Sequence, residues 1–465
     1  MVEVRFMENR LFMVFCAAAC VCSAFAMPAL RVSENRHFLM TEDGKPFFWL
    51  GDTAWELFHR LNREEVVNYL ENRARLGFNV VQAVTLAEED GLKTANSYGH
   101  LPFKDPTVPE PWVVDGPDND YWDHVDFVID AANARGIYVG LLPTWGKWWQ
   151  EGCIFTPDSA RRYAAWLARR YRDKGVVWIL GGDRNPKQPI EHELIAAFAA
   201  GLREGDGGRN LISYHPRGAG RSSEFFHASP WLDFNMRQNG HVIDCQRYEQ
   251  TRQDYDLKPT KPVIDAEPVY EGHPVAFRPD QFGHTVAADV RRALYWDLFS
   301  GACGHTYGHH SVWQMYGSTR SLVTAPNGKN RPLMPWHEAI DEPGAAQMHF
   351  AKDLLLAYPF FSRIPDPDLI VADRVQSLVP GTGTRRYAAT RDEKGTYAFV
   401  YAPVGRAFSV NLTRLAGPRI QACWMNPRTG TRSDWQEVSR SSVVRFVPPT
   451  PGELLDWVLI LESRE

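Results

Sequence analysis

Residues 62–84 read NREEVVNYLENRARLGFNVVQAV, and this stretch contains the repeating unit that decides the fold. Asn62 followed by Glu65 has the spacing of a capping box, which starts a helix. The apolar residues that then share one helical face are Val66, Val67, Leu70 and Ala74. Gly77 can end the helix in the left-handed conformation, and residues 78–84 follow as an apolar segment. The stretch therefore predicts an amphipathic helix, a glycine and a buried strand.

The same unit recurs along the chain. A helical pattern at 121–132 precedes an apolar strand at 137–142. A further helix, with Thr156 as its cap, precedes a strand at 176–180. A glycine stands between helix and strand each time, as it does at Gly77. Strands that are apolar along their whole length are typical of a parallel sheet with both faces covered.

Five further strands complete the predicted set. The first spans 47–51 after a hairpin at Asp43-Gly44, and the others begin near Leu211, Trp231, Pro262 and Gly304. Eight strands alternating with helices predict an α/β fold, a (β/α)8 TIM barrel over residues 27–365. A doubly wound open sheet is the alternative. It would carry a glycine-rich phosphate turn after its first strand, where this chain has Gly51-Asp52-Thr53-Ala54-Trp55.

The sequence changes character beyond Tyr358. Three prolines lie within 359–367, and the helical period then disappears. Short alternating runs replace it, separated by turn residues, at 397–401, 407–412, 420–424, 443–447 and 457–461. Residues 366–465 are therefore predicted to form a small all-β sandwich domain.

The composition narrows the functional classes. The 465 residues include 51 Lys and Arg against 56 Asp and Glu, a net charge of −5 without a basic block. This balance argues against a nucleic-acid partner, because such proteins neutralise phosphates with Lys and Arg. The chain also has 16 Trp, more than one core needs, and surplus indole rings often line a ligand cleft. Nothing in the sequence indicates an oligomeric state.

The first residues resemble a targeting segment. Arg5 and Arg10 precede an apolar run at 11–21, and Ala24-Phe25-Ala26 has the small residues of a cleavage site. We expect residues 1–26 to be a signal peptide and the mature protein to be exported, to the periplasm or outside the cell. A lipoprotein with Cys20 or Cys22 as its anchor is the less favoured alternative. No later stretch is long and apolar enough to span a membrane.

Four cysteines follow residue 26, at positions 153, 245, 303 and 423. They are far apart and form no Cys-x-x-Cys pair, which argues against a zinc site and a disulfide framework. Unpaired thiols are the favoured interpretation, and one disulfide is the alternative.

The active site of a barrel lies at the carboxyl ends of its strands, so the residues at those ends are candidates. The predicted substrate-binding residues are Asp52, Trp55, Gln82, Trp145, Asn185, His215, Asn235, Gln238, Tyr270, His305 and Trp313. Polar groups bind hydroxyls, and aromatic rings stack on the C–H face of a sugar. The set therefore predicts an oligosaccharide or polysaccharide substrate, in a cleft that the insertion at 86–120 helps to shape.

Two carboxylates at these ends are the predicted catalytic pair. Asp183 follows the fourth strand and Glu267 the seventh, on opposite sides of the barrel mouth. Glycoside hydrolysis needs one acid to protonate the leaving oxygen and a second carboxylate as nucleophile or base. The alternatives for Asp183 are a helix cap or a salt bridge to Arg184, and for Glu267 a buried ion pair. Asp265 is the substitute if a bulge alters the strand register.

Other patterns argue against metal chemistry. His305, His309 and His310 have no acidic neighbour in the sequence and are flanked by glycines, so we expect rim histidines rather than a metal site. The pairs at 192–193 and 337–338 begin like a zinc-protease helix, but both lack the second His. We therefore expect no metal and no other cofactor.

Several motifs resemble a known family. From Arg31 to Phe360 the chain is similar to the apiosidase-like barrel family, which includes glycoside hydrolase family 140. The motifs are Gly51-Asp52-Thr53-Ala54-Trp55, Gly77-Phe78-Asn79, Pro143-Thr144-Trp145-Gly146, Gly181-Gly182-Asp183, His215-Pro216, Glu267-Pro268-x-Tyr270-Glu271 and Gly304-x-x-Tyr307-Gly308. The C-terminal part resembles the β domain, labelled collagen-binding, that is usually fused to this barrel, through Trp424-x-x-Pro427-Arg428-Thr429-Gly430 and Asp456-Trp457-Val458-Leu459.

The resemblance implies a secreted glycosidase that cleaves apiose linkages in rhamnogalacturonan II side chains of pectin. It implies Asp183 as the catalytic acid and Glu267 as the nucleophile of a retaining reaction. The chain departs from related barrels, which carry Asn-Glu on strand four where it has Gly-Asp, and it has Ala266 where glycine is expected. The shorter acid leaves inversion open as an alternative. A carbohydrate-binding protein on a degenerate barrel is the functional alternative, whereas a protease or collagen binder is disfavoured.

Overall fold

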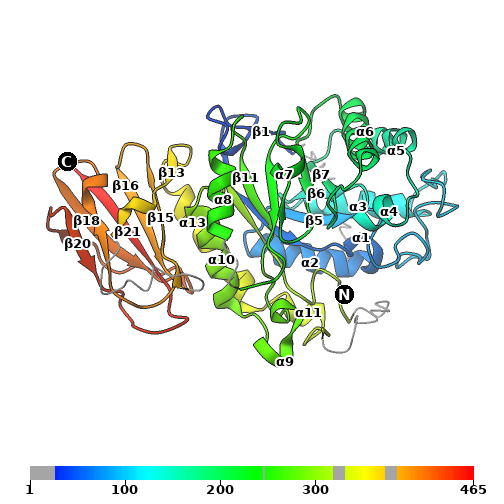
Figure 1. Ribbon diagram of the computed structural model, residues 1–465. Helices are drawn as coiled ribbons and strands as arrows, with labels where there is room; N and C mark the ends of the chain where they lie inside the picture. The colour runs from blue at the N-terminus through cyan, green and yellow to red at the C-terminus, as the bar shows by residue number, and fades with distance from the viewer. Residues whose placement is uncertain (1–26, 244–246, 318–329, 372–384) are drawn as a thin grey trace, which may run out of the picture.

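The computed structural model describes residues 27–243, 247–317, 330–371 and 385–465. The signal peptide predicted for residues 1–26 and Cys245 lie outside these ranges. Figure 1 shows the α/β part in blue to yellow and, beside it, a β domain in orange to red. No helix of the described ranges is long and apolar enough to cross a membrane.

The predicted (β/α)8 barrel is confirmed. Its eight parallel strands are β4 (Trp49–Thr53), β5 (Val80–Val84), β6 (Tyr138–Leu142), β7 (Val176–Gly181), β8 (Ile212–His215), β10 (Asn235–Gln238), β11 (Val263–Glu267) and β12 (Gly304–Tyr307). They pair in the order β8-β7-β6-β5-β4-β12-β11-β10, and the short β9 (Gly220–Arg221) adds to β10 in the antiparallel sense. The ring closes between β8 and the segment before β10, where the Asp233 N–H donates to the Ile212 carbonyl at 2.9 Å.

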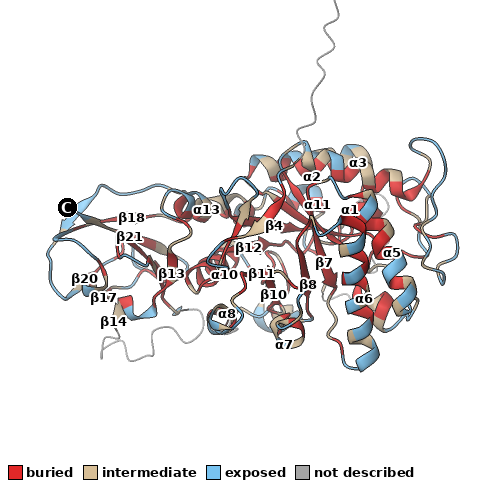
Figure 2. Ribbon diagram, turned by 90° about the horizontal axis from the view of Figure 1, so that it is seen from above, coloured by how far each residue is buried: buried red, intermediate tan, exposed pale blue. Residues whose placement is uncertain are grey.

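Helices cover the outside of the barrel, with their buried faces toward the strands in Figure 2. The longer ones are α2 (Arg63–Arg75), α3 (Tyr121–Asn133), α5 (Pro157–Arg170), α6 (Pro189–Asp206), α8 (Arg247–Asp256) and α10 (Ala287–Phe299). The shorter ones are α1 (Leu57–Arg60), α4 (Gly146–Gln150), α7 (Ser223–Phe226), η1 (Val275–Phe277), α9 (Pro279–Phe282), α11 (Trp336–Ala339), α12 (Pro343–Gln347) and α13 (His349–Leu356).

The local signals behind these helices are the ones that the sequence predicts. Asn62 and Glu65 form a reciprocal capping box at the start of α2, and Thr156 caps α5 through Ser159. Gly77 follows α2 with φ of 84°, in the left-handed region that favours glycine. The hairpin at Asp43-Gly44 joins β2 (Leu39–Thr41) to β3 (Pro46–Phe47), and β1 (Leu30–Val32) pairs with β2.

The C-terminal domain is all β, as predicted, and has two sheets. The larger consists of β13 (Arg363–Pro365), β15 (Ala388–Asp392), β16 (Tyr397–Ala402), β21 (Trp457–Arg464), β18 (Arg419–Met425) and β19 (Gln436–Val438). The smaller consists of β14 (Ile370–Val371), β17 (Phe408–Asn411) and β20 (Val443–Phe446), with η2 (Pro367–Leu369) and η5 (Leu412–Arg414) between strands. The sequence did not predict β13, β14, β15 or β19; three of these have two or three residues, and β15 shows no clear alternation. The first of them, β13, already belongs to the C-terminal sheet.

Helix α10 carries the contact between the two domains. Tyr295 stacks on Tyr401 of β16 with ring centroids 4.8 Å apart, and Phe299 stacks on Phe399 at 6.1 Å. Arg291 forms a bidentate ion pair with Asp456, with distances of 2.7 and 3.0 Å, and both side chains are almost fully buried. The two domains therefore share a buried and partly charged interface.

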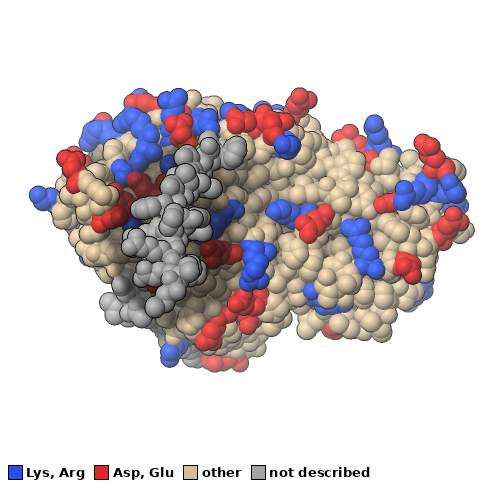
Figure 3. Space-filling view, turned by 180° about the vertical axis from the view of Figure 1, so that it is seen from behind, with Lys and Arg blue, Asp and Glu red and all other residues tan. Residues whose placement is uncertain are grey.

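The described cysteines Cys153, Cys303 and Cys423 are free thiols, and the last two are buried. Figure 3 shows that one face of the molecule carries basic and acidic side chains interspersed rather than one field of a single sign.

Candidate active site

A cavity of about 480 Å³ opens at the carboxyl ends of the barrel strands. Two of its walls carry the predicted catalytic carboxylates, Asp183 and Glu267. The other predicted residues that line it are Trp55, Trp145, Gln238, Tyr270 and Trp313. The barrel therefore brings seven of the thirteen predicted site residues to one hollow, and they come from five different strand ends and from the segment after β12.

Glu267 is the last residue of β11 and is held between two histidines. Its side chain is almost fully buried, with Oε2 3.0 Å from Nε2 of His215 and Oε1 3.2 Å from Nε2 of His241. The backbone N–H of Asp183 points to Nδ1 of His215 at 3.4 Å, so the imidazole proton belongs on Nε2, facing Glu267. Burial alone would raise the pKa of Glu267, but the two histidines outweigh it and lower this pKa to about 2. The carboxylate therefore stays ionised at working pH.

Asp183 lies on a tight turn after β7. Gly181, Gly182 and Asp183 all have left-handed backbones, with φ of 94°, 83° and 56°. A Cβ on Gly181 would lie 2.3 Å from the carbonyl oxygen of His215, so only glycine fits there. The indole N–H of Trp149 donates to the Gly181 carbonyl at 2.7 Å and braces the turn. The turn directs Asp183 into the cavity.

The electrostatics of Asp183 are opposite to those of Glu267. Burial, and then the negative charge of Glu267, raise the pKa of Asp183. Its Oδ2 is 3.2 Å from Nη1 of Arg184, the salt bridge considered as an alternative, yet this contact does not reverse the shift. The helix-cap alternative is wrong, because α6 begins at Pro189 with Gln188 as its cap. An acid whose pKa is raised therefore lies in one cavity with a carboxylate whose pKa is lowered, which is the pairing that acid-assisted glycosyl transfer needs.

Two further carboxylates, Glu88 and Glu89, line the cavity and were not predicted from the sequence. Both follow β5 at the start of the predicted insertion at 86–120. Burial, and then the charge of Asp183, raise the pKa of Glu88 to about 8. The signal in the sequence that points to them is their place just beyond the strand β5.

His241 was also missed, although the run Asn239-Gly240-His241 follows β10 directly. Nothing in the sequence shows that this loop bends back to Glu267. Gly240 and His241 have φ of 74° and 55°, and this double left-handed turn brings the imidazole to the carboxylate.

Six of the predicted substrate-binding residues do not line the cavity: Asp52, Gln82, Asn185, His215, Asn235 and His305. Asp52 is fully buried and accepts hydrogen bonds from Tyr69 and from Arg73, the latter at 2.6 Å. Asn235 is the first residue of β10, so it lies at the far end of its strand and contacts His227 at 3.2 Å. His305 is the second residue of β12 and contacts Asp297 at 3.1 Å. All three lie within their strands and not beyond them, and their side chains are buried.

The other three residues act behind the cavity wall. Gln82 donates from Nε2 to the Ala266 carbonyl at 2.8 Å, one residue before Glu267. Asn185 accepts the backbone N–H of Arg217, a residue that does line the cavity. His215 contacts Glu267 as described above. Each of them therefore contacts a lining residue or, for Gln82, the residue directly before one.

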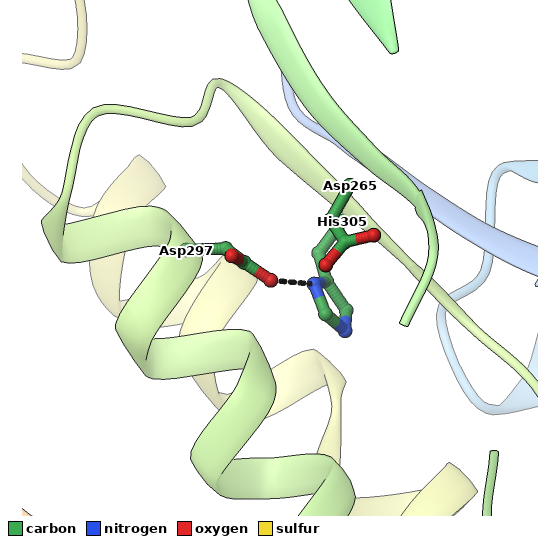
Figure 4. A group of neighbouring side chains, drawn as sticks. All are labelled: Asp265, Asp297 and His305. Atoms are coloured by element: carbon green, nitrogen blue, oxygen red, sulfur yellow. Dashed lines mark hydrogen bonds and ion pairs between the residues drawn. The ribbon is translucent and has the colours of Figure 1, made fainter. Parts of the chain in front are cut away.

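Figure 4 shows Asp265, Asp297 and His305 grouped between helix α10 and the strands β11 and β12, with one ligand atom of each within 4.8 Å of the others. A metal does not fit this group well, because Nη1 of Arg237 already lies 3.5 Å from Asp297 and Asn239 donates to Asp265. Burial, and then Asp297, raise the pKa of Asp265 to about 7. A register shift opposite Ala266 separates the fully buried Asp265 from Glu267. Glu267, and not the substitute Asp265, reaches the cavity.

The predicted rim histidines separate in the structure. His310 lines the cavity and contacts the Asn330 carbonyl at 2.8 Å through Nε2. Nδ1 of His309 accepts the backbone N–H of Ser311 at 3.0 Å. In the described ranges these two histidines belong to no cluster of potential metal ligands.

Residues 33–362 match the family profile described as "Apiosidase-like, catalytic domain". The chain belongs to the apiosidase-like family. Residues 364–462 match a second profile, described as "Putative collagen-binding domain of a collagenase". No curated protein matches the chain.

Solved structures agree with the assignment to the apiosidase-like family. A structure described as a glycoside hydrolase is 32% identical with a TM-score of 0.84, covering 95% of this chain and 98% of its own. A glycoside hydrolase of family 5 from Bacteroides vulgatus is 33% identical with a TM-score of 0.83, and the match covers 94% of this chain and 93% of that one. The apiosidase-like barrel and its β domain therefore occur together in related glycoside hydrolases, and the chain is a glycosidase by family and fold.

Proposed function

We propose that this protein hydrolyses a glycosidic bond with Asp183 as general acid and base and Glu267 as nucleophile. The observation that carries the proposal is the opposite pKa shift of two carboxylates in one cavity. Asp183 protonates the leaving oxygen while Glu267 attacks the anomeric carbon and forms a glycosyl-enzyme bond. Asp183, now ionised, takes a proton from water, which attacks the anomeric carbon and releases Glu267.

Dependence on pH tests this pairing. The reaction needs Asp183 protonated and Glu267 ionised, so kcat/KM should hold on the acidic side and fall as pH rises through the raised pKa of Asp183. At the acidic extreme, kcat/KM should fall only near pH 2, where Glu267, with its pKa of about 2, becomes protonated. In the Asp183→Asn variant the alkaline fall should disappear. An alkaline fall that persists in this variant would assign it to another group, such as Glu88.

Leaving-group chemistry distinguishes Asp183 from Glu88 as the acid. With a natural sugar as leaving group, Asp183→Asn is expected to lose about 10²- to 10⁴-fold in kcat. With an activated aryl glycoside, whose leaving oxygen needs no proton, kcat of the same variant should fall far less. The control is Glu88→Gln, which keeps a neutral polar group in the same cavity and should retain most activity on both substrates. The reverse pattern would make Glu88 the acid.

We further propose that the substrate is pectic, with apiose linkages of rhamnogalacturonan II side chains as the first candidates. The family description supports this proposal, together with the combination of indole rings and polar groups around the cavity. The test is product analysis after incubation with a panel of pectic side-chain oligosaccharides. Binding of these oligosaccharides without any product would favour a carbohydrate-binding protein instead.

Export is part of the same proposal, because pectin lies outside the cell that degrades it. The apolar run and the Ala24-Phe25-Ala26 site support it. Sequencing of the mature N-terminus from the native host should find Met27 as the first residue, and a mature chain that retains residues 1–26 would contradict export by this route.

A further inference from the structure

The rim of the catalytic cavity carries an exposed phenyl ring. Phe277 lines the cavity and is 53% exposed. By contrast, Trp55, Trp145 and Tyr270 line the same cavity with at most 2% exposed. The buried rings pack against protein, whereas Phe277 presents its apolar surface to whatever enters the cavity.

The backbone beneath this ring is strained. Ala276 and Phe277 have φ of 51° and 60°, so two successive residues with side chains are left-handed. Such a conformation is an outlier for a bulky residue. It persists only where surrounding bonds impose it. Here the Ala276 N–H donates to the His241 carbonyl, and the Val275 N–H donates to the Gly283 carbonyl, both at 3.0 Å.

The ring is also tied to the catalytic carboxylate. Phe277 makes near-perpendicular contacts with His273, at 4.8 Å between centroids, and with His241, at 5.7 Å. These two imidazoles stack on each other at 4.0 Å, and Nε2 of His241 lies 3.2 Å from Glu267. One ring therefore separates Phe277 from the reacting carboxylate, which places it beside the bond to be cleaved rather than far along a surface.

We propose that Phe277 is a stacking platform for a second sugar ring, in the subsite next to the one that Glu267 attacks. This inference rests on the proposed glycosidase function. The C–H face of a sugar is apolar and stacks on an aromatic ring, and strained residues cluster at ligand sites. The substrate is thus an oligosaccharide recognised on both sides of the cleaved bond.

The test compares an oligosaccharide with the glycosyl fluoride of the sugar that it releases, because a fluoride leaving group has no ring to stack on Phe277. Phe277→Gly removes the ring and fits the left-handed backbone, so the loop keeps its shape. The ratio of kcat/KM for the oligosaccharide to that for the glycosyl fluoride should fall about tenfold, mainly through KM. Phe277→Trp should keep the ratio near that of the unaltered protein. Because strain is released, the unfolding temperature of Phe277→Gly should not fall.

Phe282→Ala is the matched control, because Phe282 is an equally exposed phenyl ring on α9, 52% exposed, that does not line the cavity. It should leave the ratio unchanged. An unchanged ratio in Phe277→Gly, or an equal fall in Phe282→Ala, would overturn the inference.

A binding measurement separates this inference from the proposed function. On an inactive Glu267→Ala background, retardation in gels containing rhamnogalacturonan II should be lost with Phe277→Gly and kept with Phe282→Ala. An unaltered protein that cleaves nothing but shows this pattern would overturn the proposed function alone. Retardation that is absent, or that survives Phe277→Gly, would overturn the platform.

Discussion

Glu267→Ala is expected to lower kcat by about 10⁴-fold or more, as the removal of a group that acts within a catalytic unit does. The carboxylate is ionised, shielded from water and aimed into the cavity, and no other described carboxylate is held between two histidines in this way. The measurement is kcat on the best pectic oligosaccharide, with circular dichroism to show that the variant is folded.

Two controls make this result specific. Glu89→Gln changes a carboxylate on the same cavity that lacks the histidine contacts, and it should cost much less. With an activated aryl glycoside, azide should restore activity to Glu267→Ala by attacking the anomeric carbon from the emptied side. The product is then a glycosyl azide of inverted configuration. Activity near that of the unaltered protein in Glu267→Ala would remove Glu267 from the reaction, and a lack of azide rescue would favour the inverting alternative.

The second large effect is expected far from the cavity, at Asp456. This residue is almost fully buried and accepts hydrogen bonds from Arg291 at 2.7 and 3.0 Å and from Tyr401 at 3.0 Å. Arg428 contacts it at 3.1 Å. Asp456→Ala leaves the buried Arg291 without its countercharge, and breaking such a pair costs about 3–5 kcal/mol. We expect a loss of this size in the free energy of unfolding, measured in urea by tryptophan fluorescence.

An exposed ion pair provides the comparison. Arg161 and Glu204 lie 3.1 Å apart with side chains 60% and 50% exposed, and such pairs contribute at most about 1 kcal/mol. Glu204→Ala should therefore change stability little. Equal losses in the two variants would show that the domain interface is not stabilised by Arg291 and Asp456. A large loss at Asp456 alone would indicate that the β domain stabilises the barrel through this buried contact.

The fold could be predicted from the sequence because its signals are local. The Asn62 capping box, the glycine after each helix and the apolar strands all act within a few residues, and each appears where the pattern places it. The short strands β13 and β14 escaped prediction because their pairing partners lie farther along the chain and their own residues show little alternation.

The site could be predicted only in part, for the same physical reason. Asp183 and Glu267 stand at strand ends, so barrel geometry alone predicts that they face one cavity. The role of Asp52 depends on Arg73, one helix away, and that of His241 on a loop that turns back to Glu267. Such contacts join residues that are far apart in the chain, so no spacing pattern in the sequence indicates them.

The left-handed turn at residues 181–183 also constrains which acid can stand after β7. Asp and Asn tolerate that backbone region better than longer side chains do, so a glutamate in this place would meet a conformational penalty that aspartate largely avoids. A redesign that places a glutamate at position 183 would therefore have to rebuild the turn as well as replace the acid.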